Sequence, residues 1–415
     1  MSVATSPQKP KGWKRPLMVD VFRSIPVGII ETSQTTFAIL IAVQFYQASQ
    51  DQKIWLQLGS PAGLLLGLFA VPMIQRLSWS INRGIALLWG ISSVGFLMGW
   101  WLQDSSWCFA FANFFGILGL TLSIPFLSQL YRDFYPAHLR GRLFSISAML
   151  KKATAIIFAL WMGKYLDQHM ENASVTMLIY AGCGALMVLA AFLYPKSYLE
   201  NKPKAPLFKA FRHLKTDREF RMLIISWLFL GLGNLMAMAL FVEFISNPRY
   251  GHAYSPNLVA QITTIIPEAV FMLTVFAWGV LFDKLNFYLL RALINIVFAV
   301  AVIMYFLSGG EYWWLMIGIG LHGFAKAGGN VAWSLWVTKF SKPQYVAEYM
   351  SVHTFFTGLR ATIAPIVAMN AAGMGMPVQV GLVGGGLMIF ATLFLIPEIR
   401  LLARRKGHTE SPDPR

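Results

Sequence analysis

The sequence predicts an all-α integral membrane protein, and three observations support this fold class. Hydrophobic residues make up 56% of the chain and charged residues only 13%, with a mean hydropathy of +0.57. Some twelve apolar stretches each supply the ~20 residues that a spanning helix needs. The loops between these stretches alternate in charge. A soluble core could not bury this much apolar surface, so lipid must cover most of it.

The apolar stretches define the expected helices and their grouping. They cover residues 22–47, 55–75, 84–102, 106–131, 143–166, 173–195, 221–246, 257–282, 286–308, 311–338, 345–371 and 376–397. The longest polar interruption lies between the sixth and seventh stretches. The predicted divisions are an N-terminal tail (1–21), a first six-helix bundle (22–195), a linker (196–220) with an amphipathic piece at 208–214, a second six-helix bundle (221–397) and a C-terminal tail (398–415).

The net charge of +16 is distributed unevenly across the predicted membrane. On one side the loops contain only Lys53, Lys164 and Arg249, whereas nearly all other loop cations lie on the opposite side. The positive-inside rule therefore places both termini in the cytoplasm. We expect a multi-pass protein of the plasma membrane, or of the inner membrane in a bacterium, with the lipid bilayer rather than nucleic acid as its large partner.

A weak internal repeat relates the two predicted bundles. Residues 134–145 and 340–351 occupy corresponding junctions between a loop and a helix, at the same spacing in each half. Such a repeat implies two parallel six-helix units, and transporters built from repeats place their substrate site between the units near the bilayer midplane.

Two loop motifs carry a resemblance to a known family. Gly279 is followed by Asp283, Lys284 and Arg291, and the first half carries Arg140-Gly-Arg142 after span four. Together with the twelve-helix pattern, these motifs resemble the major facilitator superfamily of secondary transporters across nearly the whole chain. The resemblance implies two bundles related by a pseudo-two-fold axis around a central cavity.

The same resemblance implies roles for the motif residues in gating. Asp283 would pair with cations of the other bundle and hold the cytoplasmic face closed, with Lys284, Arg291, Arg140 and Arg142 as gating residues. Gly279 would allow two helices to approach closely. The equivalent loop of the first half lacks an acidic residue, so the latch is expected on one side only.

Ionisable side chains inside the apolar stretches are the strongest functional signal. A charge at such depth costs ~3 kcal/mol or more unless it is paired or hydrated, so a set of them indicates a wet cavity. The resemblance places helices one, four, seven and ten around that cavity. The set comprises Glu31, Lys151, Lys152, Glu268, Lys326 and Arg360.

These charges suggest an anionic or zwitterionic substrate, because four cations face two carboxylates. Arg360 is suited to grip a carboxylate or phosphate, and Lys326 offers a mobile point charge. Adjacent helical positions diverge by about 100°, so we expect Lys152 to reach the cavity and Lys151 to extend to the cytoplasmic edge. Glu31 would bind substrate or a proton and Glu268 would balance charge. The alternative is that both carboxylates only neutralise the cations in structural ion pairs.

Neutral polar residues complete the candidate site. Gln34 and Thr35 belong to a polar run in the first span, and Asn330 and Trp333 follow Lys326 on its helix. We expect these four to contact substrate, with interhelical hydrogen bonding or ordinary packing as the alternative. His322 and His353 would relay protons, although a buried histidine bonded to a carbonyl group is the commoner case.

The sequence therefore favours a secondary active transporter, a monomer that moves a small organic solute by alternating access in proton symport. An exporter of amphiphilic drugs or lipids is the first alternative, and a non-transporting receptor or assembly factor is the second. No nucleophile with a base, metal-ligand spacing or phosphate loop is evident, so neither an enzyme nor a cofactor is expected. Gly318-Ile-Gly320-Leu-His-Gly323 matches a dinucleotide pattern but lies in an apolar helix, where small residues allow close packing.

Overall fold

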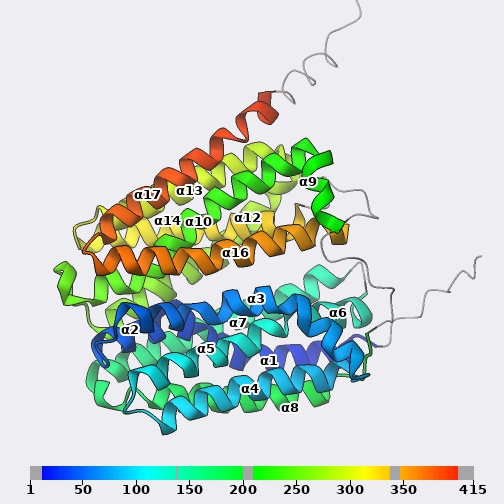
Figure 1. The fold of residues 1–415 in the computed structure, drawn as a ribbon, viewed down its shortest axis with the longest axis horizontal. Coiled ribbons are helices and arrows are strands. Elements are labelled where there is room, and N and C mark those ends of the chain that lie inside the picture. The colour runs from blue at the N-terminus through cyan, green and yellow to red at the C-terminus, as the bar shows by residue number, and fades with distance from the viewer. Residues whose placement is uncertain (1–11, 137–138, 200–208, 337–345, 401–415) are drawn as a thin grey trace, which may run out of the picture.

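The protein is described by a computed structural model over residues 12–136, 139–199, 209–336 and 346–400. Within these ranges all regular structure is helical and no strand occurs. Figure 1 shows long helices that lie side by side along the molecule. This agrees with the all-α class expected from the sequence.

The helices follow the predicted stretches. In the first part of the chain they are α1 (Lys14–Thr32), η1 (Ser33–Phe37), α2 (Ala38–Gln44), α3 (Gln50–Arg76), α4 (Ile81–Trp101), α5 (Ser106–Leu122), α6 (Ile124–Phe134), α7 (Arg140–Gln168), η2 (Met170–Asn172) and α8 (Val175–Leu193). The second part contains η3 (Lys209–Arg212), α9 (His213–Thr216), α10 (Arg218–Ser246), η4 (Pro248–Tyr250), α11 (Pro256–Ala260), η5 (Gln261–Ile265), α12 (Ile266–Lys284), α13 (Phe287–Phe306), α14 (Tyr312–Leu335), α16 (Val346–Gly373) and α17 (Pro377–Leu393).

Ten helical stretches of the described chain are long and apolar enough to cross a membrane. The two remaining long helices are α3 and α14, which coincide with the second and tenth predicted spans. Both carry polar residues in their middle, such as Gln57 on α3 and Lys326 on α14. These residues line an internal cavity described below, which explains why the two helices are less apolar than their neighbours.

Some boundaries differ from those predicted. Helix α1 begins at Lys14 rather than at residue 22, because Asp20 and Arg23 pair with each other at 2.5 Å inside the structure. The fourth predicted span is split at Ser123 into α5 and α6, where Pro125 lies in the first turn of the new helix. The amphipathic piece of the linker forms η3 and α9, and η3 packs on α16. The predicted repeat at 134–145 and 340–351 lies partly outside the described residues.

The helices pack in two sets, which Figure 1 shows as an upper and a lower group. In the first set α1 packs on α7 and α8, while α4 packs on α5 and α8. In the second set α10 packs on α16 and α17, while α13 packs on α14 and α17. The sets meet where α3 contacts α16, α2 contacts α10, α7 contacts α11, and η1 contacts η5.

Glycines allow several of these close approaches, but not at every predicted position. A Cβ atom on Gly323 of α14 would lie 2.5 Å from the carbonyl oxygen of Pro267, so this residue permits tight packing as expected. Gly318 likewise faces the backbone of Tyr305. The expectation for Gly279 was wrong, because a Cβ atom there would meet no atom within 4 Å.

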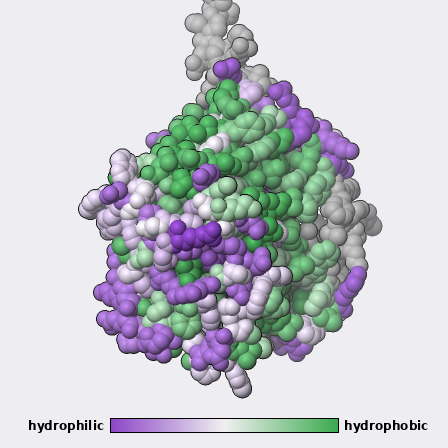
Figure 2. All heavy atoms as spheres, turned by 60° about the vertical axis from the view of Figure 1, so that its left-hand side comes forward, coloured by the Kyte–Doolittle hydropathy of each residue, from purple (hydrophilic) through white to green (hydrophobic). Residues whose placement is uncertain are grey.

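The outer surface is largely apolar along the helices. Leu273 and Phe276 of α12 are 81% and 70% exposed, as expected for side chains that face lipid tails. Figure 2 shows hydrophilic residues gathered on the end that faces the viewer and hydrophobic residues along the sides. Exposed indoles lie at the predicted outer ends of helices, where a headgroup layer would receive them; they are Trp55, Trp100, Trp101, Trp107, Trp313 and Trp314.

Candidate functional site

A chain of alternating charges crosses from one helix set to the other. Glu31, near the end of α1, accepts from Lys151 Nζ at 2.6 Å through Oε1 and from Lys152 Nζ at 3.4 Å through Oε2. Lys152 also donates to Glu268 Oε1 of the second set at 3.0 Å, and Lys326 donates to the same oxygen at 2.8 Å. Lys152 therefore bonds to a carboxylate of each set.

The network differs from the expectation in one respect. Lys151 does not extend away to the cytoplasmic edge, because both adjacent lysines reach Glu31 through different oxygens. Their long, flexible stems compensate for the divergence of adjacent helical positions. Three lysines thus share two carboxylates, which leaves one formal positive charge in excess.

The two carboxylates of the network lie beside irregular helical turns. Glu31 precedes the π-helical turn η1 (Ser33–Phe37), and Glu268 follows the π-helical turn η5 (Gln261–Ile265). The two turns meet, since Thr36 Oγ1 lies 2.6 Å from Thr263 Oγ1. Such turns are frequent at functional sites, because they widen the helix and redirect its side chains.

Burial makes the energy of the Glu268 carboxylate depend on its lysine partners, because little water reaches it. Glu268 is 2% exposed, and its Oε2 has no hydrogen-bond partner among the described residues. The side chains of Glu31 and Lys326 are 32% and 30% exposed. The network therefore has a buried centre at Glu268 and accessible groups at either side, a geometry that lets a solute reach Lys326.

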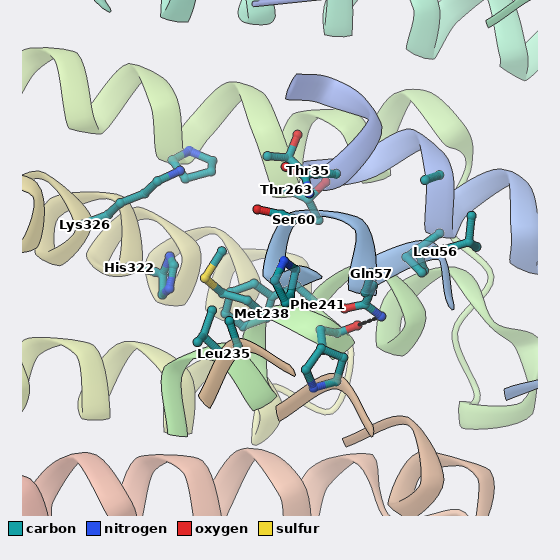
Figure 3. A pocket seen from close by; sticks show the side chains of 18 of the residues that line it. Thr35, Leu56, Gln57, Ser60, Leu235, Met238, Phe241, Thr263, His322 and Lys326 are labelled. Atoms are coloured by element: carbon teal, nitrogen blue, oxygen red, sulfur yellow. Dashed lines mark hydrogen bonds between the residues drawn. The ribbon is translucent and has the colours of Figure 1, made fainter. Parts of the chain in front are cut away.

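A cavity of about 260 Å³ lies beside Lys326 and between the two sets. Figure 3 shows Lys326 and His322 projecting from the same helix, with His322 beside Met238 and Leu235 of α10. Of the predicted substrate residues, Gln34, Thr35 and Lys326 line the cavity, together with His322. The sequence reasoning did not single out the other polar lining residues, Gln57, Ser60 and Thr263. Their signal was weak, because isolated amides and hydroxyls are common in spanning helices.

His322, which lines the cavity, also has a side-chain partner, because its Nε2 lies 2.9 Å from the amide carbonyl oxygen of Asn234. Other predicted residues lie away from this cavity. Asn330 and Trp333 are exposed and are not among the lining residues. The ring of Trp333 is 5.8 Å from the ring of His353, which is itself buried within the second set.

Arg360 is also separate from the network. It is 8% exposed on α16, and its guanidinium donates to the carbonyl of Trp227 and, at 3.2 Å, to Thr357 Oγ1. The structure therefore does not bring Arg360 together with Glu31 or Glu268. It lies instead with Arg291 of α13, which is 2% exposed.

The remaining predicted gating residues lie at helix ends. Asp283 and Lys284 are exposed at the end of α12, and neither forms an ion pair within the described part of the chain. Arg142 is exposed near the start of α7. The side chain of Arg140 lies outside the described residues.

A second group of contacts joins the sets at the opposite, predicted outer end. Lys53 of α3 pairs with Glu243 of α10 at 2.7 Å, and the side chains are 4% and 0% exposed. Gln44 Nε2 donates to the carbonyl oxygen of Tyr254 at 2.8 Å, and the backbone N–H of Asn257 donates to Asp167 Oδ1 at 2.8 Å. These contacts could not be predicted from the sequence, because charged residues near helix ends normally face water.

Comparison with known proteins provides fold-level evidence. No protein-family model matches the chain, and no curated protein sequence matches it. Among solved structures, it is similar to a nucleoside transporter, NupG (TM-score 0.74, 11% identity, covering 92% of this chain and 99% of that one). It is also similar to a POT family transporter in complex with 5-aminolevulinic acid (TM-score 0.69, 14% identity, covering 92% of this chain and 95% of that one). A third similar structure is a D-xylose-proton symporter (TM-score 0.62, 14% identity, covering 92% of this chain and 96% of that one).

The sequence identities are low, whereas each alignment covers nearly the whole length of both chains. The shared property is thus the arrangement of helices rather than the site. All three of those proteins are transporters. The chain therefore shares the helical fold of these three solved structures.

Proposed function

We propose that this protein is a secondary active transporter for a small anionic or zwitterionic organic solute, built from twelve spans in two six-helix bundles. The observation that carries the proposal is the position of Lys326, which lines the cavity while bonding to Glu268. A solute anion in the cavity can replace that carboxylate as the partner of Lys326. The network then rearranges, because Glu268 keeps only Lys152, and protonation of Glu268 would release the link that Lys152 makes between the two sets.

The same exchange provides a route for proton coupling. Once a substrate anion occupies Lys326, the buried Glu268 carboxylate has fewer cationic neighbours. Its one remaining cation, Lys152, is shared with Glu31, and a poorly compensated buried charge is unfavourable, so a proton neutralises it. Entry of one anion and one proton together keeps the net charge of the site unchanged, which is the logic of symport. Release of both on the other side restores the ion pairs.

The contacts between the two helix sets suggest how access to the cavity could alternate. Contacts such as Lys53–Glu243 close the predicted outer end in this conformation. We propose that the two bundles rock about the network, so that the cavity opens to one side of a plasma or inner membrane at a time. Both termini would be cytoplasmic, and a monomer suffices because the cavity is formed by one chain.

A screen for stabilising solutes tests the proposal. Purified protein would be melted with carboxylates, phosphates, amino acids, neutral sugars and cationic amphiphiles, and each stabilising solute would then be tested for flux in proteoliposomes with and without a pH gradient. We expect anions or zwitterions to raise the Tm and to be transported faster down an inward proton gradient. Lys326→Gln should weaken this binding about tenfold or more.

The control variant is Lys164→Gln, which removes the same charge from an exposed position of α7. It should bind and transport as the wild type does. Stabilisation and flux of amphiphiles alone would instead support an exporter. Binding without flux of any solute would support a receptor, and it would refute the transport proposal.

A further inference from the structure

Two buried arginines in the second helix set have no carboxylate partner among the described residues. The guanidinium carbon of Arg291 lies 4.8 Å from the ring centroid of Trp227, and its Nε and Nη2 atoms make no hydrogen bond within the described chain. Arg360 donates to the carbonyl of the same Trp227, but its Nε atom also lacks a described partner. Two cations thus lie around one indole.

Neutral polar groups in the same region are also unsatisfied. Asn295, one helical turn after Arg291 on α13, is 0% exposed, and neither its amide oxygen nor its amide nitrogen has a partner in the described residues. His353 is 1% exposed, and the centroid of its ring lies 4.0 Å from that of Trp227. Its Nε2 atom also has no hydrogen-bond partner in the described residues. Buried polar groups normally have partners, so this concentration of unsatisfied atoms requires an explanation.

The first helix set shows how this chain treats a buried arginine that needs no ligand. Arg23 is 8% exposed and also lies over an indole, with its guanidinium carbon 5.9 Å from the ring of Trp89. Asp20 pairs with it at 2.5 Å, and Tyr131 and Tyr194 donate to Asp20 at 3.1 Å each. Arg23 is therefore neutralised within the fold, whereas Arg291 and Arg360 are not.

The backbone of α10 makes room for one of these two arginines. A Cβ atom at Gly231 of α10 would overlap the guanidinium of Arg360, so the glycine makes room for that side chain. Leaving an ion unpaired in such a buried position is unfavourable by several kcal/mol. A fold that makes space for two uncompensated cations is best explained by an anion that neutralises them.

We propose that Arg291, Arg360, Asn295 and His353 form a binding site for a small anion inside the second helix set, separate from the substrate cavity. The guanidinium groups provide charge and hydrogen-bond donors, and the amide of Asn295 provides a further donor. Arg291 is the fifth residue of α13, close to the end that carries the basic loops. The bound anion locks α10, α13 and α16 together and stabilises the set that the substrate cavity adjoins.

Thermal unfolding of the full-length protein tests this site without knowledge of the substrate. The baseline is sodium gluconate, and the probes are sodium chloride and sodium phosphate at constant ionic strength. We expect either probe to raise the Tm of the wild type by a few degrees in a saturable manner. A response to chloride alone identifies a halide site, and a response to phosphate alone identifies an oxyanion site.

Variants separate this site from the transport cavity. Arg291→Gln should abolish the anion response and should not lower stability in gluconate, because it removes an uncompensated charge. Asn295→Leu is a second test variant in case Arg291→Gln does not fold. It should reduce the rise in Tm caused by the anions at least severalfold. Lys326→Gln, altered in the substrate cavity, should respond as the wild type does.

Two outcomes would overturn the inference. One is a wild-type Tm that is independent of both anions, and the other is an unchanged response in Arg291→Gln and Asn295→Leu. A response that disappears in Lys326→Gln but persists in Arg291→Gln would place the anion in the substrate cavity. That result would refute the second site while supporting the proposed function.

Discussion

At the scale of single residues, Glu268 decides the energetics of the network. Its Oε1 accepts from lysines of both helix sets, and only 2% of the residue is exposed. Removing one member of a buried ion pair is destabilising by about 3–5 kcal/mol, because the remaining charge is left without a partner. Glu31, by contrast, is partly exposed and can exchange partners with water.

Glu268→Gln should therefore lower both stability and transport. We expect a Tm several degrees below that of the wild type and at least a tenfold loss of flux in proteoliposomes, since Lys326 loses its charged partner. The double variant Glu268→Gln/Lys326→Gln should recover most of the lost Tm but none of the flux, because it removes the unpaired lysine along with the binding group. A double variant no more stable than Glu268→Gln would show that the two residues are not coupled.

The sequence singled out all five charged members of the network, because charges inside apolar stretches are expensive unless they serve a purpose. Lys152, Glu268 and Lys326 do lie together. It could not predict the position of Arg360, whose neighbours depend on how α10 and α16 cross at Gly231. Depth in a helix can be counted along a sequence, but the face toward which a side chain points in the assembled set cannot.

At the scale of helices, close packing of α10 on α17 depends on paired glycines. A Cβ atom on Gly233 would overlap the carbonyl oxygen of Gly384. Small residues at such crossings let the backbones of membrane helices approach closely. This contact supports α10, which carries Glu243 and Trp227.

Gly233→Ala should separate these helices and lower the Tm by several degrees. Gly386→Ala is the matched control, because it makes the same change on α17 where no atom lies within 4 Å. It should leave the Tm unchanged or slightly raised, since alanine favours the helix. Equal Tm values for the two variants would contradict the packing.

The segment between η4 and α11 provides a pH-dependent element at the predicted outer end. His252 packs 5.0 Å from the ring of Phe244, and burial lowers the pKa of its imidazole below the usual 6.5. The unfolded chain then binds more protons than the folded one between the two pKa values, so stability rises with pH across that window. The stabilisation is complete above about pH 6.5 and declines below it.

Hydrogen exchange in residues 248–256 measures this effect. Protection should fall as the pH is lowered from 7 to 5, after correction for intrinsic exchange rates. His252→Gln should have a flatter profile, because glutamine does not titrate. A wild-type profile as flat as that of the variant would remove His252 as the cause.

At the scale of the whole molecule, the sequence predicted the fold class well but said little about how the two helix sets meet. Apolar length and loop charge predicted an all-helical membrane protein, because the bilayer imposes both on any chain. The contacts that close the outer end were not predicted, since Lys53 and Glu243 lie near helix ends, where a charge normally faces water. Their pairing depends on how the two sets meet, which no local pattern specifies.

The Lys53–Glu243 pair makes the proposed rocking motion measurable without a known substrate. Spin labels at residues 104 and 311 report on the outer end, and labels at 83 and 289 report on the opposite end; all four residues are exposed. Lys53→Met breaks the buried pair and should shift the population toward an outward-open state. Lys164→Met, at an exposed site, is the control.

Distances between these spin labels, measured by double electron–electron resonance in lipid nanodiscs, test alternating access most directly. In Lys53→Met the distance between residues 104 and 311 should lengthen while the distance between residues 83 and 289 shortens, and the control should match the wild type. Distances that stay fixed in Lys53→Met and with every stabilising solute, or that lengthen together at both ends, would contradict two bundles rocking about the Glu31–Lys152–Glu268–Lys326 network.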